Sequence, residues 1–185
     1  MKATKKWGLK DMETRTLEVI KTFLDDFDPS SDERKNDLCE LLTVIDNSQK
    51  NGIVDKCLST LVKFCNEIIP CQGFLNLEEH LIRKILTHNN FKYNNVLALF
   101  EAIRDWGMNQ IIQRHLKPSK LQVIVAELLA LISIDSIEDA DFINTVLPSD
   151  CLGKADIIAF FMIRGMEIPR DLAFNNNKQV SKLIF

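Results

Sequence analysis

Glycine and proline are scarce in this chain, which has six glycines and five prolines among 185 residues. Because these residues mark turns and interrupt helices, their scarcity argues against long loop-rich or disordered segments. The chain is 46% hydrophobic and 26% charged, which is ordinary for a protein with a buried core. We therefore expect a folded chain with short connections.

The sequence also lacks the marks of exported, membrane-spanning or strongly nucleic-acid-binding proteins. No stretch reaches the roughly 18 apolar residues needed to cross a bilayer, and the lysine-rich start precedes no apolar core of a secretory signal. The formal net charge of −3 argues against a main task of neutralising phosphates. Five cysteines, an odd number, are typical of a reducing compartment. We predict an intracellular protein, cytoplasmic or nuclear, with no membrane partner.

Apolar residues recur at helical spacing from Met12 onward, and no segment alternates as a half-buried strand would. The predicted fold class is all-α. Asn51-Gly52 is predicted to form a turn, and Pro70 to end a helix. Helices are expected up to about residue 27 and over residues 32–48, 53–69, 77–88, 93–106, 119–134, 137–147, 154–166 and 178–185.

Connections this short force neighbouring helices to pack as antiparallel hairpins. Segments 121–134 and 157–162 are apolar nearly all round, so we expect them to be covered on more than one side. The pattern predicts hairpins stacked as a right-handed solenoid or superhelical bundle of about 8–9 helices. Residues 1–11 are expected to form a flexible basic terminus, and residues 12–185 a single repeat-like helical domain.

Two segments resemble known helical families. Leu75 to Asn109, which ends in LALFEAIRDWGMN, resembles a pentatricopeptide-type repeat, and Gly165 to Pro169 resembles the same helix end. This likeness implies a helical-repeat architecture of the pentatricopeptide, TPR and HEAT kind. Pentatricopeptide arrays read RNA, but the register fails across Gln110 to Ser136, so no RNA-reading residue is assigned. Leu41 to Gly52 is similar to part of VHS-type superhelical domains, which bind short peptides.

Residue types suited to catalysis or metal binding occur in spacings that do not favour either. Cys65, Cys71, His80 and His88 are zinc-ligand types, but structural zinc sites place their paired cysteines two to four residues apart. Cys71 is the cysteine expected to be most exposed. No cysteine lies in a local setting that suggests a base able to lower its pKa, and the glycines are isolated. We predict a non-enzyme with no catalytic, cofactor-binding or metal-binding residues and no cofactor.

Candidate partner-binding residues are basic or apolar side chains outside the predicted core. One group surrounds an aromatic at the basic start, a second is a cluster at a helix start, a third follows one edge of the array, and a fourth is the apolar end. A solvated face also explains the basic groups, and Trp106 is expected in the core. The candidates are Trp7, Arg83, Lys84, Lys92, Arg104, Arg114, Lys117, Lys120, Leu183 and Phe185.

The predicted function is a non-enzymatic scaffold or adaptor that binds another protein or peptide. The alternative is an RNA-binding module of pentatricopeptide type, motivated by the 35-residue unit and by the basic cluster from Arg114 to Lys120. The apolar C-terminal end also favours a homo-oligomer, because a solenoid end must be capped or buried.

Overall fold

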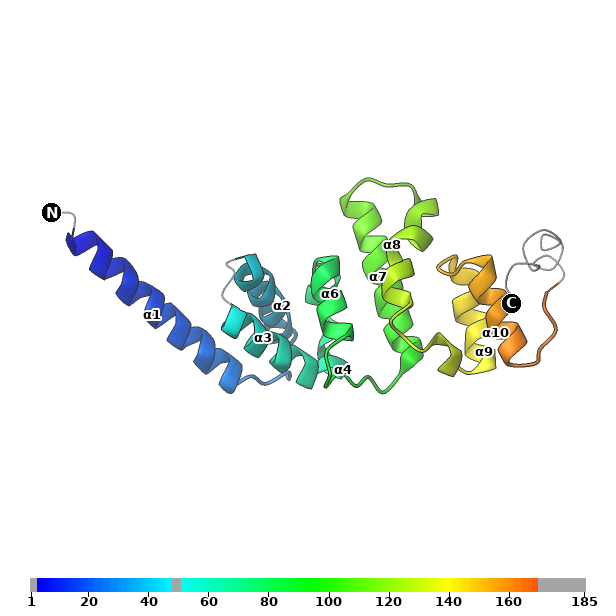
Figure 1. Ribbon diagram of the computed structural model, residues 1–185, viewed down its shortest axis with the longest axis horizontal. Helices are drawn as coiled ribbons and strands as arrows, with labels where there is room; N and C mark the ends of the chain where they lie inside the picture. Colours follow the sequence, from blue (N-terminus) through cyan, green and yellow to red (C-terminus); the bar gives the residue numbers. More distant parts are fainter. Residues whose placement is uncertain (1–2, 48–50, 170–185) are drawn as a thin grey trace, which may run out of the picture. The chain divides into compact units, whose positions relative to one another are not determined.

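The computed structural model describes residues 3–47 and 51–169, and in this part of the chain it contains helices and no strand (Figure 1). The predicted all-α class is therefore confirmed, while the solenoid stays a prediction. Contacts divide the chain into two compact units, which we call unit 1 (residues 1–95) and unit 2 (residues 96–185). The sequence predicts one continuous domain, because the helical pattern continues past the boundary. The non-helical segment from Thr87 to Asn95 precedes that boundary.

Unit 1 is built on α2, which packs against α3 and α5, while α3 also contacts α1 and α6. Its core contains the fully buried Leu38, Leu42, Leu61, Phe74 and Ile82. The helices are α1 (Ala3–Asp25), α2 (Asp32–Asn47), α3 (Asn51–Lys63), α4 (Cys65–Ile68), α5 (Gln72–Leu75) and α6 (Glu79–Leu86).

Helix α1 begins at Ala3, so most of the segment predicted as a flexible terminus, residues 1–11, is helical. Its far end is fixed to the rest of unit 1 by an ion pair of 2.6 Å between Asp25 and Lys56 of α3. The Phe27 ring also lies 5.5 Å from the Phe64 ring. Ser31 then accepts a hydrogen bond from the Arg34 backbone N–H, which stabilises the start of α2.

One local prediction in unit 1 is wrong, because Asn51 and Gly52 form the first turn of α3 instead of a turn between helices. Cys71 is the most exposed of the five cysteines, as predicted, but it is buried, with 7% of its surface exposed. The reason is the short helix α5, which follows Pro70 and brings the chain back onto α2, where the Gly73 N–H donates a 2.6 Å hydrogen bond to Asn36 Oδ1.

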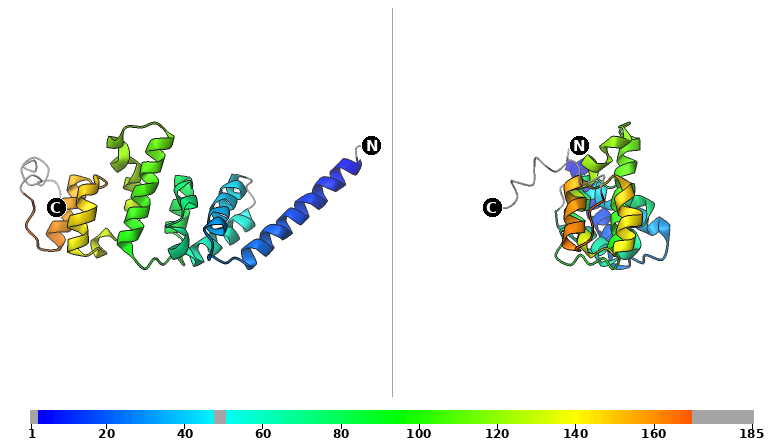
Figure 2. Two further views of the ribbon diagram at one scale, coloured as in Figure 1. Left: turned by 180° about the vertical axis from the view of Figure 1, so that it is seen from behind. Right: turned by 90° about the vertical axis from the view of Figure 1, so that its right-hand side faces the viewer.

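Unit 2 begins with the hairpin of α7 and α8, which lie side by side (Figure 2). Its core contains Phe100, Trp106, Val125, Phe142 and Phe160, so Trp106 is a core residue as predicted. The α-helices are α7 (Val96–Gln113), α8 (Leu121–Leu129), α9 (Asp139–Asp141) and α10 (Lys154–Ile163). Shorter turns are the 3-10 helix η1 (Pro118–Lys120), the 3-10 helix η2 (Ile134–Ser136), the π-helix η3 (Phe142–Val146) and the 3-10 helix η4 (Leu147–Ser149).

The helix predicted at 93–106 begins at Val96 in the structure, and it continues to Gln113 because Gly107 does not end it. Gly107 is buried against α8, and a Cβ atom there would collide with Val125 Cγ1 and lie 2.9 Å from Leu121 Cδ1. The glycine therefore allows the two helices to approach closely.

The later helices of unit 2 are shorter than predicted. The 119–134 helix ends at Leu129, and the 137–147 helix is divided among α9, η3 and η4. Val123 of α8 and Ile163 of α10 are 70% and 71% exposed, so the two helices are not covered all round. The predicted helix at 178–185 lies outside the described residues.

Candidate docking groove

An apolar groove of about 340 Å³ lies in unit 2, between α8 and the start of η2 on one side and α10 on the other. Most of its lining side chains are aliphatic or aromatic, and two are carboxylates. The lining residues are Gln122, Ala126, Leu129, Ala130, Ile132, Ile134, Asp135, Cys151, Leu152, Gly153, Asp156, Ala159, Phe160 and Ile163. Its volume is at the lower end of the ~300–1,000 Å³ of small-ligand pockets.

The chain reaches the groove wall through a turn at Asp150, whose φ of 56° is left-handed. Gly153 then precedes α10, and its N–H donates a 3.2 Å hydrogen bond to Asp156 Oδ2. A Cβ atom at Gly153 would lie 3.0 Å from Gln122 Nε2 of α8. The start of α10 therefore lies against the side chain of Gln122 on α8.

Arg164 joins the two sides of the groove. Its Nη2 donates hydrogen bonds to the Asp135 and Ile137 carbonyl oxygens at 2.6 and 3.0 Å. Its Nη1 forms a 3.4 Å ion pair with Asp139, and the guanidinium lies 5.5 Å from the centre of the Phe160 ring. A single side chain at the end of α10 therefore holds η2 and α9 in place.

The groove has an acidic surrounding. Asp135 and Asp156 line it, and both are exposed. No lysine or arginine is among the described residues that line it. The sequence between these two aspartates also contains Glu138, Asp139, Asp141 and Asp150, against a single basic residue, Lys154. Arg164, beside the groove, neutralises part of this charge through its ion pair with Asp139. A ligand with an apolar centre and positive charge beside it matches this surface.

Two of the three basic candidates of unit 1 form ion pairs with acidic residues. Arg83 pairs with Glu79 at 3.0 Å, and Lys84 with Asp46 at 2.7 Å. Lys92 is exposed, and its backbone carbonyl accepts a hydrogen bond from the Cys65 thiol at 3.1 Å. Acidic neighbours therefore partly neutralise two of the three.

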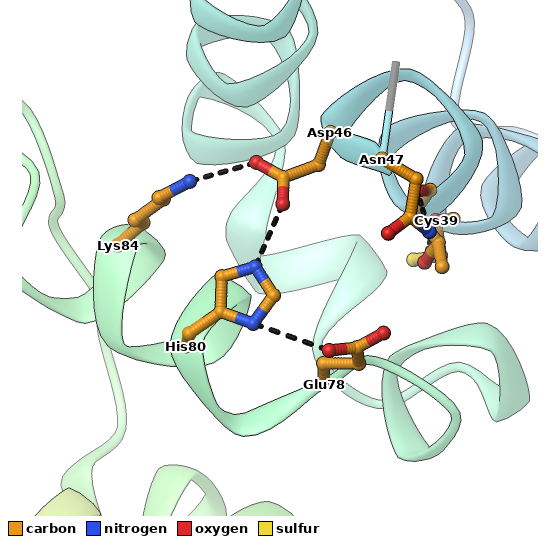
Figure 3. A network of polar contacts seen from close by, with 7 residues as sticks. Cys39, Asp46, Asn47, Glu78, His80 and Lys84 are labelled. Carbon is orange, nitrogen blue, oxygen red and sulfur yellow. Dashed lines mark hydrogen bonds and ion pairs between the residues drawn. The ribbon is translucent and has the colours of Figure 1, made fainter. Parts of the chain in front are cut away.

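Figure 3 shows the polar network that contains Lys84. Asp46 of α2 accepts hydrogen bonds from His80 Nε2 and from Lys84 Nζ, both of 2.7 Å. His80 Nδ1 lies 3.4 Å from a Glu78 carboxylate oxygen. Lys84 and His80 hold the pKa of Asp46 below its ordinary value. Because Asp46 belongs to α2 and both of its partners, His80 and Lys84, belong to α6, the network joins these two helices.

The basic candidates of unit 2 comprise one paired residue and one exposed cluster. Arg104 pairs with Asp105 at 2.9 Å. Arg114, Lys117 and Lys120 are exposed in the connection between α7 and α8, together with His115. The side chain of Trp7 and the residues Leu183 and Phe185 lie outside the described part of the chain, so the predictions for them stay predictions.

The cysteines and histidines considered as zinc ligands are not brought together at one site. Cys65 bonds to a backbone carbonyl, His80 contacts Asp46 and Glu78, and His88 Nδ1 accepts a hydrogen bond from the Asn90 N–H. Among the described residues, no three His, Cys, Asp or Glu side chains are arranged to hold a metal ion.

Comparison with known proteins gave no match to a family model, to a curated protein or to a solved structure. The pentatricopeptide-type and VHS-type resemblances therefore remain predictions. None of the helices in the described residues is long and apolar enough to cross a membrane.

The groove residues are absent from the partner-binding residues predicted from sequence. Ile132 and Ile163 are apolar residues of predicted helices, which sequence reasoning assigns to the core, and Leu152 lies in a predicted connection. The available signal was the concentration of acids from Asp135 to Asp156 beside apolar helices.

Proposed function

We propose that this protein is a protein-interaction module that binds, in the unit 2 groove, a short apolar segment of another protein flanked by Lys or Arg. The observation that carries the proposal is an apolar groove with two exposed aspartates and no basic residue among its described lining. Peptide recognition commonly combines apolar anchors, which supply affinity, with charges at the rim, which supply orientation and speed of association.

The exposure of Ile163 supports a binding role for this surface. Its side chain lines the groove and is 71% exposed, so it adds little to the core of unit 2. A partner that covers it would gain apolar burial worth about 25 cal/mol per Å². The same contact would bury the neighbouring walls formed by Ile132 and Ala159.

The test is selection of a random peptide library displayed on phage against the immobilised full chain, followed by fluorescence polarisation with the selected peptides. We expect apolar sequences flanked by Lys or Arg, with micromolar affinity that weakens as salt increases. Ile163→Glu should reduce affinity about tenfold or more, because it places a charge against the apolar anchor.

Val123→Glu is the matched control, since Val123 is 70% exposed on α8 and does not line the groove. It should leave the affinity unchanged. Equal binding by the two variants, or selection of acidic peptides, would refute the groove as the site. A dimer that sedimentation detects in the unmodified chain and that Ile163→Glu abolishes would instead identify a second copy as the occupant.

The exposed cluster of Arg114, Lys117 and Lys120 favours RNA binding as a second candidate function. Its test is filter binding of single-stranded RNA to the full chain at low and moderate salt. Lys117→Glu combined with Lys120→Glu should abolish any salt-dependent affinity if the cluster is the contact. The absence of such affinity at low salt would eliminate this candidate.

A further inference from the structure

The chain changes direction at the end of α10, the helix that forms one side of the groove. Gly165 has a left-handed φ of 65°, and its N–H donates a 3.2 Å hydrogen bond to the Met162 carbonyl oxygen. The Met166 N–H donates a 3.0 Å hydrogen bond to the Phe161 carbonyl oxygen. This pair of bonds is the Schellman motif, in which a left-handed glycine ends a helix. The residues after Gly165 therefore leave the direction of the helix axis.

Pro169, the last described residue, lies next to the groove. It lines a second cavity of about 840 Å³ in unit 2, together with Leu121 of α8 and Ile157 of α10. Gln122 and Leu152 line both this cavity and the groove. The two cavities therefore share a wall, with Pro169 on one side of it and the groove on the other.

The sequence after Pro169 contains a match to the ligand proposed above for the groove. Residues 178–185, KQVSKLIF, which we call the tail segment, place two lysines beside an apolar run and contain no acidic residue. The described lining of the groove is mostly apolar, with two aspartates and no lysine or arginine. The tail segment and the groove are therefore complementary in both hydrophobicity and charge.

The residues between Pro169 and the tail segment are long enough to connect it to the groove. Residues 170–177 number eight, and an extended chain spans about 3.3–3.6 Å per residue, so that they reach up to about 29 Å. Because the cavity at Pro169 and the groove share lining residues, the connection has to pass only the wall between them.

We propose that the tail segment binds in the unit 2 groove of its own chain. Leu183, Ile184 and Phe185 cover the apolar lining, and the two lysines face Asp135 and Asp156. This inference rests on the proposed function, because it gives the groove of that function an occupant within the chain. A partner must therefore displace the tail segment before it can bind.

The short connection makes this competition effective. A segment joined to its site by a short linker has an effective concentration of about 1 mM. Even if its own Kd were about 0.1 mM, the tail segment would occupy about nine-tenths of the grooves. The remaining tenth is open to a partner, so the apparent Kd of the partner rises about tenfold.

The first test locates the tail segment directly. The full chain carries the photoreactive amino acid p-benzoylphenylalanine in place of Phe185, and peptide mapping after irradiation identifies the residue to which it is joined. Gel electrophoresis separates a link within one chain from a link between two. We expect a link within one chain to a peptide that contains Ile132, Ala159 or Ile163. Ile163→Glu should abolish this link, and Val123→Glu, outside the groove, should retain it.

The second test measures the competition by fluorescence polarisation with a peptide selected against the groove. The full chain with Leu183→Ser, Ile184→Ser and Phe185→Ser should bind this peptide about tenfold more tightly than the unmodified chain. Leu172→Ser with Phe174→Ser is the matched control, because it removes apolar side chains from the sequence after Pro169 without altering the tail segment. Its affinity for the peptide should be unchanged.

The outcomes separate this inference from the proposed function. The absence of a link to the groove would overturn the inference, and the proposed function would stand if selected peptides still bind. A link to the groove in a chain that binds no peptide would support the inference and refute the proposed function. A link between two chains would overturn the inference by identifying a second copy as the source of the segment. Unchanged affinity in the triple serine variant would also overturn it, because the tail segment would not compete for the groove.

Discussion

Gly107 of α7 faces Val125 of α8 with no room for a methyl group between them. Val125 is fully buried and β-branched, so its side chain cannot rotate away easily. Elsewhere, glycine in the middle of a helix lowers stability by about 1 kcal/mol relative to alanine. Here the close approach of the two helices outweighs that preference.

The first prediction is that Gly107→Ala destabilises the protein by about 1–2 kcal/mol, because overpacking costs more than the gain in helix propensity. Gly52→Ala is the matched control, since a Cβ at Gly52 would meet nothing within 4 Å. It should be neutral or stabilising by up to about 1 kcal/mol. Urea unfolding followed by circular dichroism measures both, and stabilisation by Gly107→Ala would contradict the close contact.

The second prediction concerns the acid sensitivity of the α2–α6 contact. Since the folded state lowers the pKa of Asp46, its contribution is present above the unfolded pKa of about 3.9 and is lost as the pH falls through the lower folded value. Asp46→Asn should therefore cost about 0.5–1 kcal/mol at neutral pH, because its partners are partly exposed, and close to nothing in strong acid.

Asp55→Asn is the control for this measurement, since Asp55 is an exposed acid on α3. Thermal unfolding from neutral pH to strong acid should give Asp55→Asn a profile parallel to that of the unmodified protein. A stability difference for Asp46→Asn that does not shrink in acid would mean that the carboxylate charge is not responsible.

The third prediction tests the aromatic core of unit 2. The rings of Phe142 and Phe160 are stacked with centres 3.5 Å apart. Phe142→Ala should destabilise by about 3–5 kcal/mol, as expected for a fully buried ring. Ile143→Ala, one residue further along η3 and partly exposed, should cost less than about 1.5 kcal/mol. Similar losses of stability in the two variants would mean that Phe142 is not part of the core of unit 2.

The fourth prediction links the groove wall to the proposed binding function. Arg164→Lys removes the planar fork that bonds to the Asp135 and Ile137 carbonyl oxygens, so it should cost about 1 kcal/mol of stability and weaken peptide binding several-fold. Arg83→Lys is the control, because Arg83 belongs to unit 1 and forms its ion pair with Glu79. Calorimetry measures the stability of each variant, and fluorescence polarisation measures its affinity for the peptide. A loss of stability without weaker binding would mean that Arg164 does not contribute to the binding site.

The helical class could be predicted because apolar spacing of 3.6 residues is visible in the sequence alone. The helix limits could not, because they depend on what each residue contacts. Glycine is typical of a helix end, but Gly107 lies inside α7, where its missing side chain leaves room for Val125 of α8. Cys71 follows a proline as a loop residue would, yet α5 buries it against α2.

The basic candidates show the same limit. Lys84 appears in the sequence as a free surface charge, and its partner Asp46 is 38 residues earlier. The groove could not be predicted either, since an exposed Ile163 and a buried Ile157 belong to the same apolar run. Composition distinguishes a protein with a core from one without, but only the fold decides which apolar side chains remain uncovered.

The division at residue 95 also affects how the protein emerges during synthesis. Ribosomes add about 5–20 residues each second, so unit 2 requires about 5–20 s after the last residue of unit 1 has been joined. Domains rich in local helical contacts fold within microseconds to milliseconds. Unit 1 can therefore bury its apolar faces long before translation of the docking groove is complete.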